Sequence, residues 1–504
     1  MMKALIHSFM HASLVNIISL SLVMLSITAA AAGFVLQNDI IAFVSLAFTM
    51  LLLSYYFPKQ LLFLIVFSMP FSLEMLHSSK DLFQQFSGGI NPNGLAATLL
   101  IVFALPVITV KAWRAGWRPP LSIALYAAFL TWAAMTVLYS DNPSTGLKYA
   151  GYMVYLLISL VLYQYLRHTG RISASTLIKW LLTGVTISAL LGYIFHILNI
   201  DFLDIYRTAK IMGTEIKRFT NPFGYGAAHW GLSMALVTIV AAVTMPIRRR
   251  HKAFHIIALY SAILTLIITY TRIPFLVMSI YLLFWTAYQK KYLIWTLVLV
   301  GIFAVLILTP MGLRFHFFTF ALKDYEKAEQ VEQKSSKQEE EEVDEYYELT
   351  QLDEKRLFFQ TALSGRGILL KAGIQLVTKA PVLGYGLGSA EQRLYLFLRH
   401  TWKVNVPIVT IHSEILRSII DTGYIGAALL LLFLIRLFTE ILKKLKQKSK
   451  FAMLGMMVFF YFLICLSIEP LFTLYRFGGS LFFLIFALVL SEGNEYVAKQ
   501  KQLP

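Results

Sequence analysis

Long apolar runs separated by short polar connections make up most of the chain. The runs number about fourteen, and most approach the roughly 20 apolar residues that an α-helix needs to cross a membrane. Apolar and polar residues do not alternate within them, and backbone groups in lipid must be hydrogen-bonded within their own segment. The runs therefore predict helices and not strands of a barrel. The predicted spans cover residues 13–36, 40–57, 60–78, 93–110, 120–139, 147–166, 174–200, 222–246, 254–271, 273–288, 292–309, 410–436, 451–467 and 477–491.

The composition agrees with this pattern. Of the 504 residues, 58% are hydrophobic and only 14% are charged, and the mean hydropathy is +0.67. Soluble proteins of this size are far less apolar. The sequence therefore predicts an all-α polytopic membrane protein in a lipid bilayer. Its first run, 13–36, is interpreted as a span because it is too long for the apolar core of a signal peptide.

The net charge of +17 comes largely from basic residues in the connections. Short basic clusters occupy alternate connections, which is the pattern that sets orientation in a membrane, so no nucleic acid partner is predicted. By the positive-inside rule these connections face the cytoplasm, and both termini are then predicted to be cytoplasmic. The clusters consist of Lys111, Arg114 and Arg118; Arg167 and Arg171; Arg248, Arg249, Arg250 and Lys252; Lys290 and Lys291; and Lys443, Lys444, Lys446, Lys448 and Lys450.

The longest polar stretch divides the chain into four parts. It forms a large extracytoplasmic loop, residues 310–409, on the face opposite the basic clusters. N-terminal spans occupy 1–200, central spans with arginines on the outer face occupy 201–309, and C-terminal spans occupy 410–504. Within the loop, 326–354 is an acidic insertion rich in Glu, Gln, Lys and Ser, which predicts a solvated helix or a disordered segment.

Three arginines lie in or beside the outer connections, where the positive-inside rule disfavours them. Arg218 precedes Asn221-Pro222, Arg272 lies in a very short break between two spans, and Arg366 lies near the end of the large loop. A lone arginine at such a place is usually an interface anchor. Three of them on one face instead indicate a site for an anionic ligand.

The start of the twelfth span carries titratable side chains. Glu414, Arg417 and Asp421 are spaced i, i+3 and i+7, so on a helix they share a face and can pair. His412 is offset from that face by roughly 200°, at about 100° per helical residue. Beside an outer pocket, an imidazole is a candidate general base because it takes up a proton near neutral pH.

A glycine-rich stretch, 381–388, precedes this span. It predicts a tight turn and not a dinucleotide fingerprint, because Ser389 stands where that fingerprint requires glycine and no strand precedes it; backbone amides of the turn can still meet an anion. The sequence has no phosphate-binding Gly-x-x-x-x-Gly-Lys-Ser/Thr loop, no Asp-x-Asp motif and no zinc-ligand spacing. No nucleotide, metal or other cofactor is therefore predicted.

The segment from Arg366 to about residue 437 resembles the O-antigen ligase and polymerase family of bacterial membrane glycosyltransferases. Two earlier stretches, Thr271-Arg272 and Arg218 with Asn221-Pro222, are similar to further family positions. The sequence departs from the pattern at Ser413, where the family usually has asparagine, at Phe223, where a second asparagine is common, and in the acidic insertion. The residues that carry the resemblance are Arg366, Pro381, Gly384, Tyr385, Gly386, His412, Ser413, Leu416, Asp421, Gly423 and Gly426.

The resemblance implies a GT-C-like fold and a metal-independent, inverting transfer of a glycan from undecaprenyl diphosphate. The reaction would take place on the periplasmic face of the bacterial inner membrane, in lipopolysaccharide or surface-polysaccharide biosynthesis. The acceptor would be lipid A core for a ligase or a second lipid-linked repeat for a polymerase. In this interpretation Arg218, Arg272 and Arg366 bind the diphosphate, His412 is the general base, and Glu414 orients it.

Two other classes of function fit parts of the pattern. A flippase or transporter of a lipid-linked glycan would also have many spans with charges facing the interior, although here the candidate cations gather on one side and not at mid-membrane depth. A non-catalytic scaffold would use the acidic segment 326–354 to recruit partners.

Overall fold

The computed structural model of the protein describes a helical chain with one short hairpin. The hairpin pairs β1 (Thr208–Ile211) antiparallel with β2 (Thr214–Lys217). The structure describes residues 18–29, 32, 39–70, 104–198, 208–211, 214–217, 227–245, 249–269, 271–308, 366–401, 411–449, 451–468 and 476–492. An N-terminal helix, Ile18–Ala29, is followed by α2 (Asp39–Tyr56), α3 (Pro58–Ser68), α7 (Leu105–Arg114), α8 (Leu121–Thr136), a 3₁₀ turn η2 (Val137–Tyr139), α9 (Pro143–His168), α10 (Ala174–Ile197), α11 (Ala227–Val243), α12 (Arg249–Ile268), α13 (Arg272–Tyr288), α14 (Tyr292–Leu308), α17 (Arg366–Val377), α18 (Ala390–Thr401), α19 (Glu414–Lys446), α20 (Ala452–Ile468) and α21 (Arg476–Leu490).

The prediction of a helical membrane protein is confirmed. Every predicted apolar run overlaps a helix, and prolines lie where helices tolerate them, in the first turns of α3, α7 and α9. The number of spans stays a prediction, as does the large outer loop, most of which lies outside the described residues. Among the described residues, four helices are long and apolar enough to cross a membrane, or five counting one bent pair: Leu121–Tyr139, Pro143–His168, Ala174–Ile194 and Glu414–Lys446, with Ala47–Tyr56 plus Pro58–Phe67 as the pair.

Two boundaries differ from the prediction. The runs 40–57 and 60–78 meet in an elbow of 119°, because Phe57 leaves the helical conformation and Pro58 cannot continue the α2 hydrogen bonds. The C-terminal lysines Lys443, Lys444 and Lys446 lie in the last turn of α19 and not in a connection. Cations are stabilised at that end of a helix by the exposed carbonyl groups, so the helix extends ten residues beyond the predicted end.

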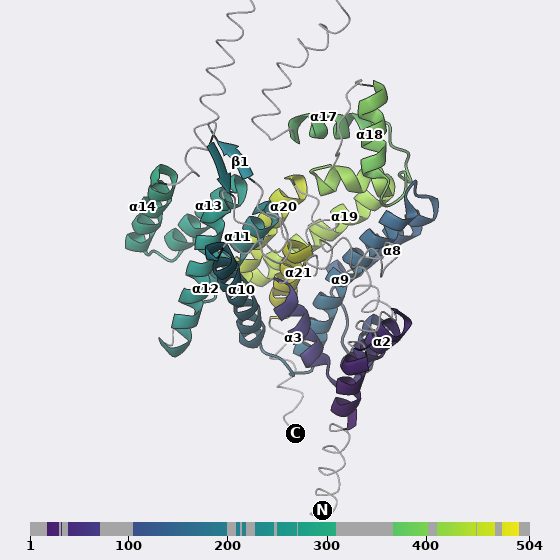
Figure 1. Ribbon diagram of the computed structural model, residues 1–504, viewed down its shortest axis with the longest axis horizontal. Coiled ribbons are helices and arrows are strands. Elements are labelled where there is room, and N and C mark those ends of the chain that lie inside the picture. The colour runs from purple at the N-terminus through teal and green to yellow at the C-terminus, as the bar shows by residue number, and fades with distance from the viewer. Residues whose placement is uncertain are drawn as a thin grey trace, which may run out of the picture.

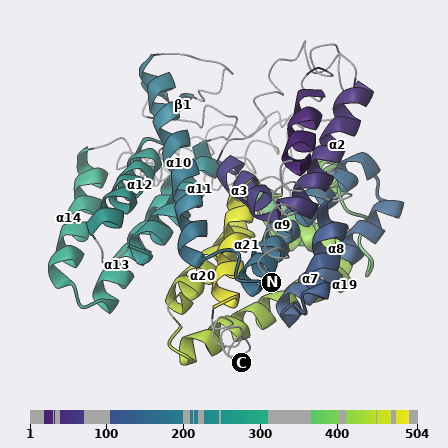
Figure 2. The same cartoon turned by 90° about the horizontal axis from the view of Figure 1, so that it is seen from below.

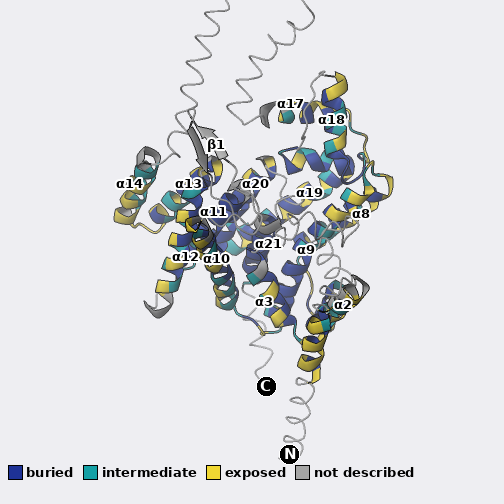
Figure 3. Ribbon diagram, viewed as in Figure 1, coloured by how far each residue is buried: buried dark blue, intermediate teal, exposed yellow. Residues whose placement is uncertain are grey.

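The core lies between the central helices. Buried residues are concentrated on α9, α11, α20 and α21, whereas α8, α12 and α14 expose much of their surface (Figure 3). Aromatic rings join α8, α19 and α21, where the Tyr126 ring lies 5.2 Å from Phe433 and 4.6 Å from Phe483. From below, α12, α13 and α14 form one flank and α2, α7 and α8 the other, with α20 and α21 between them (Figure 2).

The helix α9 runs between two ends of the molecule that have different neighbours. Its 26 residues correspond to a length of about 39 Å. Asn142 caps its first turn by accepting a hydrogen bond from the Thr145 amide, and Arg167 and His168 lie in its last turn. The helices α17 and α18 lie in the upper part of Figure 1, above the start of α19, and the hairpin lies in the upper part of the view at a distance from them. The glycine-rich stretch is bound next to Asn142, so the two ends of α9 have different surroundings.

Candidate functional site

A small helical cap surrounds the start of α19. The helices α17 and α18 pack on the first turns of α19 and form a core separate from that of the main bundle. Gly423, with φ 69° and ψ −173°, kinks α19 and divides the turns in the cap from those in the bundle. The buried apolar residues of the cap are Ala372, Leu376, Ala390, Leu394, Phe397, Leu398, Ile411 and Ile420.

The glycine-rich turn is hydrogen-bonded to this kink. The Tyr385 amide donates to the Ile420 carbonyl at 2.9 Å, the Gly386 amide to the Asp421 carbonyl at 2.8 Å, and the Tyr424 amide to the Val382 carbonyl at 2.9 Å. The predicted tight turn is therefore confirmed. An anion does meet the end of this turn, but that anion is the Asp421 carboxylate, which accepts from the backbone amides of Gly388, Ser389 and Ala390, the last at 2.7 Å.

Glycine is required in this turn for two reasons. Gly384 has φ +78°, and a Cβ there would lie 2.4 Å from the Asp421 carbonyl oxygen. The glycines of the family motif thus form the contact between the cap and the kink. They are structural residues of the site.

We expect Gly384→Ala to lower the free energy of unfolding by about 2–3 kcal/mol, because both the backbone conformation and the contact with α19 oppose a Cβ. Gly170→Ala is the matched control. Gly170 also has a left-handed φ of +69°, but no atom lies within 4 Å of its added Cβ. Thermal unfolding of both variants in detergent separates the two contributions, and equal losses would show that the close contact is unimportant.

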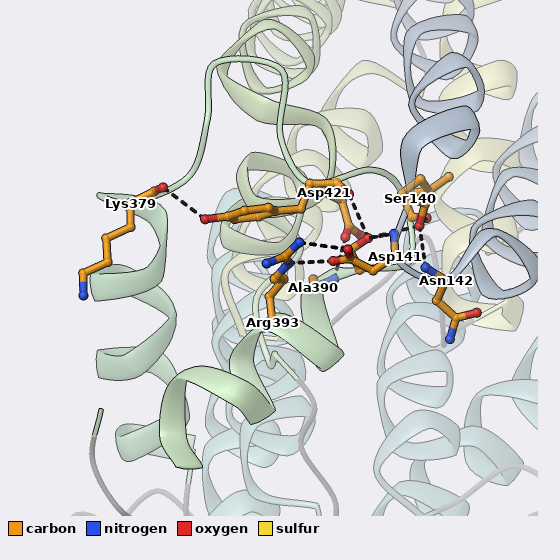
Figure 4. Close-up of polar contacts among 10 residues, drawn as sticks. Ser140, Asp141, Asn142, Lys379, Ala390, Arg393 and Asp421 are labelled. Carbon is orange, nitrogen blue, oxygen red and sulfur yellow. Dashed lines mark hydrogen bonds and ion pairs between the residues drawn. The ribbon is translucent and has the colours of Figure 1, made fainter. Parts of the chain in front are cut away.

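A second set of contacts joins the cap to the turn between α8 and α9. The Ser140 hydroxyl donates to the Leu387 carbonyl at 2.8 Å, and the Asp141 amide donates to the Ser389 hydroxyl at 2.9 Å. The Arg393 guanidinium binds both Asp141 carboxylate oxygens, at 2.5 and 2.8 Å (Figure 4). Its Cζ also lies 4.3 Å from the centroid of the Tyr385 ring. The sequence analysis did not predict the ion pair of Arg393 with Asp141. The polar residues between the apolar runs 120–139 and 147–166 were a signal that this connection could form polar contacts.

The charged face predicted on α19 is present and buried. The exposed fractions of Glu414, Arg417 and Asp421 are 1%, 1% and 0%. Arg417 Nε lies 3.7 Å from Asp421 Oδ2. Arg417 is also paired with Glu391 at the start of α18, and its guanidinium contacts Tyr149 of α9 both through the phenolic oxygen, at 3.2 Å, and over the ring, at 4.6 Å. The partner that the sequence did not indicate is thus Glu391.

His412 lies on the bend immediately before α19. It is partly buried between two buried neighbours, Ile411 and Ser413. The Ser413 side chain is the N-cap of α19 and accepts from the Leu416 amide at 3.4 Å. Serine and asparagine both cap helices well, which explains physically why serine can replace the asparagine of the family pattern. Glu414 follows in the first turn, where a carboxylate is favoured by the helix dipole.

We expect Ser413→Ala to lower the free energy of unfolding by about 1 kcal/mol, whereas Ser413→Asn should be nearly neutral. Only alanine removes the side-chain oxygen that accepts the N-cap hydrogen bond of α19. Thermal unfolding of the two variants against the unmodified protein measures this. A loss in Ser413→Asn as large as that in Ser413→Ala would contradict the capping role.

The structure places the predicted arginines only in part. Arg272 opens α13 and Arg366 opens α17, but their side chains, and the whole of Arg218, lie outside the described residues. The break before Arg272 is as short as predicted, and Thr271 within it is buried, with its hydroxyl 2.9 Å from that of Thr269. The joint diphosphate site of the three arginines therefore stays a prediction. In the part of the chain that the structure describes, no group of three or more His, Cys, Asp or Glu residues could hold a metal ion.

A family model places most of this site in a known domain. Residues 256–431, a little over a third of the chain, match the model of the O-antigen ligase. The match includes Arg272, Arg366, His412 and Glu414 and leaves out Arg218. No curated protein matches the chain closely enough to count as a relative. Residues 256–431, which include the helices of the cap and the kinked start of α19, are therefore similar to the O-antigen ligase domain.

Proposed function

We propose that the protein is a metal-independent, inverting glycosyltransferase that moves an undecaprenyl-diphosphate-linked glycan to an acceptor hydroxyl on the outer face of the bacterial inner membrane. The observation that carries the proposal is the O-antigen ligase domain over residues 256–431, which includes the cap and the start of α19. The family match supports lipid-linked glycans as the class of substrate. The carrier lipid, the stereochemistry and the acceptor are the proposed part.

The reaction requires a base on one side of the anomeric carbon and a cationic site on the other. The acceptor oxygen attacks the anomeric carbon while the bond to the diphosphate oxygen breaks, and His412 takes the hydroxyl proton. The departing diphosphate gains negative charge, which guanidinium groups stabilise through paired hydrogen bonds in a site of low dielectric. Arg218, Arg272 and Arg366 are assigned to that role, and Glu414 to orienting the base.

The buried charges support this assignment by fixing the position of the base. His412 is separated by one residue from Glu414 and precedes a helix whose first turns are held by the pairing of Arg417 with Asp421 and Glu391. Asp421 is in turn bound by the Ala390 amide. A base must be placed to within a fraction of an ångström for proton transfer, so a rigid support of this kind favours catalysis over simple binding.

The proposed orientation has support at the opposite end of α9. Connections that the positive-inside rule assigns to the cytoplasm meet there: Lys111 binds the Tyr55 carbonyl oxygen, and a His168 ring nitrogen lies 3.2 Å from the Ala115 carbonyl oxygen. The cap lies at the other end, beside Asn142. The cap and its His412 would then face the periplasm, with both termini cytoplasmic.

The test uses purified protein in liposomes that contain EDTA and no nucleotide. An undecaprenyl-diphosphate-linked repeat and lipid A core are supplied together, and the products are identified by mass spectrometry. Glycan on the core would establish a ligase, and longer glycan on the carrier lipid a polymerase. Recovery of both substrates unchanged, with active control enzymes, would contradict the proposal and favour a transporter.

A variant pair makes this assay specific. Arg272→Ala should abolish transfer, because it removes a proposed diphosphate contact. Arg436→Ala is the control, because Arg436 lies on an exposed part of α19 and pairs only with Glu440, at 3.0 Å, among the described carboxylates. Full activity of folded Arg272→Ala would remove this arginine from the proposed site.

A further inference from the structure

A basic cavity lies at the elbow between α2 and α3, at the end of α9 opposite the cap. The two helices meet there at 119°, and the open cavity has a volume of about 590 Å³. Its polar wall carries Lys59 and Gln60 from the start of α3 and Arg171 from the connection after α9. Its apolar wall carries Leu20, Tyr56 and Phe57.

The cavity has positive charge without a matching negative charge. No carboxylate is among its lining residues, and Lys59 and Arg171 are both exposed. Among the described residues neither of the two forms an ion pair. Lys111 lies nearby, where it binds the Tyr55 carbonyl oxygen. Burial lowers the pKa of Lys111, and the charge of Arg171 lowers it further. The effect of Arg171 on Lys111 shows that basic side chains are gathered at this place.

The two kinds of wall match an amphipathic anion. Leu20 is 55% exposed and Tyr56 is 43% exposed, so apolar surface borders the cations directly. The cavity opens at the elbow of two apolar helices, where the headgroup layer of the cytoplasmic leaflet would lie if the basic connections face the cytoplasm. Basic pockets between helices on this side of a membrane bind lipid phosphates.

We propose that the elbow cavity binds the headgroup of an anionic phospholipid, with Lys59 and Arg171 on the phosphate and Leu20, Tyr56 and Phe57 against the glycerol and the first acyl carbons. The site is separated from His412 by the length of α9, so it is independent of the catalytic proposal. It would anchor the elbow of α2 and α3 to the anionic leaflet.

The test is a lipid titration of the full chain in nonionic detergent, read by native mass spectrometry. Phosphatidylglycerol is the probe, and phosphatidylcholine with the same acyl chains is the zwitterionic reference. Lys59→Gln combined with Arg171→Gln should weaken the first phosphatidylglycerol by about thirty-fold, from the attraction of two charges at a membrane surface. Phosphatidylcholine binding should not change.

The control variant is Lys290→Gln combined with Lys291→Gln, which removes two exposed cations from another basic connection. It should bind phosphatidylglycerol like the unmodified protein. An unchanged affinity in the Lys59 and Arg171 variant would overturn the proposal. Displacement of the lipid by millimolar inorganic phosphate alone would also overturn it, because the cavity would then be a site for free phosphate.

Discussion

His412→Ala should reduce glycan transfer by about 10²–10⁴-fold while leaving the protein folded, which is the range that removal of a general base produces. The residue precedes the N-cap of α19 and lies outside the helical turns that hold the cap together. Truncation of His412 therefore removes the base but keeps the N-cap hydrogen bond of Ser413 and the ion pairs of Arg417. The measurement is the initial rate of transfer in liposomes, with thermal unfolding as the test of folding.

The matched control is His400→Ala. His400 lies in the last turn of α18 and is exposed, so it belongs to the same cap but not to the start of α19. We expect the control to keep the rate of the unmodified protein within about a factor of three, because surface substitutions away from a site change little. If both variants were equally active, the assignment of His412 as the base would be wrong.

Hydropathy was enough to predict the helices but not their angles. The length of an apolar run predicts a helix because lipid provides no other hydrogen-bond partner for the backbone. Pro58 marked the end of α2, but whether the chain would turn by 119° or continue as a kinked span depends on packing against α9 and α10. The kink at Gly423 has the same origin, because its φ of 69° is needed only where Val382 approaches α19.

The candidate site was predictable where its residues are close in sequence. The helical spacing was sufficient to place Glu414, Arg417 and Asp421 on one buried face. Glu391 and Asp141 were missed, because their partners Arg417 and Arg393 are 26 and 252 residues away. The pairs form only when α18 packs against the start of α19 and against the turn between α8 and α9. Periodicity carries no information about such contacts.

Arg417→Leu should lower the free energy of unfolding by about 3–5 kcal/mol, the cost of leaving the buried Asp421 carboxylate without the cation that compensates it. Arg417 is 1% exposed, and it contacts Asp421, Glu391 and Tyr149. Leucine has enough volume to limit the cavity, so the expected loss is mainly electrostatic. Thermal unfolding in detergent measures the effect.

The same helix supplies a control in which the identical substitution should have little effect. Arg436→Leu breaks an i, i+4 pair with Glu440, but the Arg436 side chain is 46% exposed, so the expected loss is below about 1 kcal/mol. Adding Asp421→Asn to Arg417→Leu should recover part of the loss, because an amide oxygen can still accept from the Ala390 amide without an uncompensated charge. Equal losses in Arg417→Leu and Arg436→Leu, or no recovery in the double variant, would mean that the cap is held by apolar packing. In that case the base would owe its position to the small core around Leu394 and Ile420 and not to the buried charges.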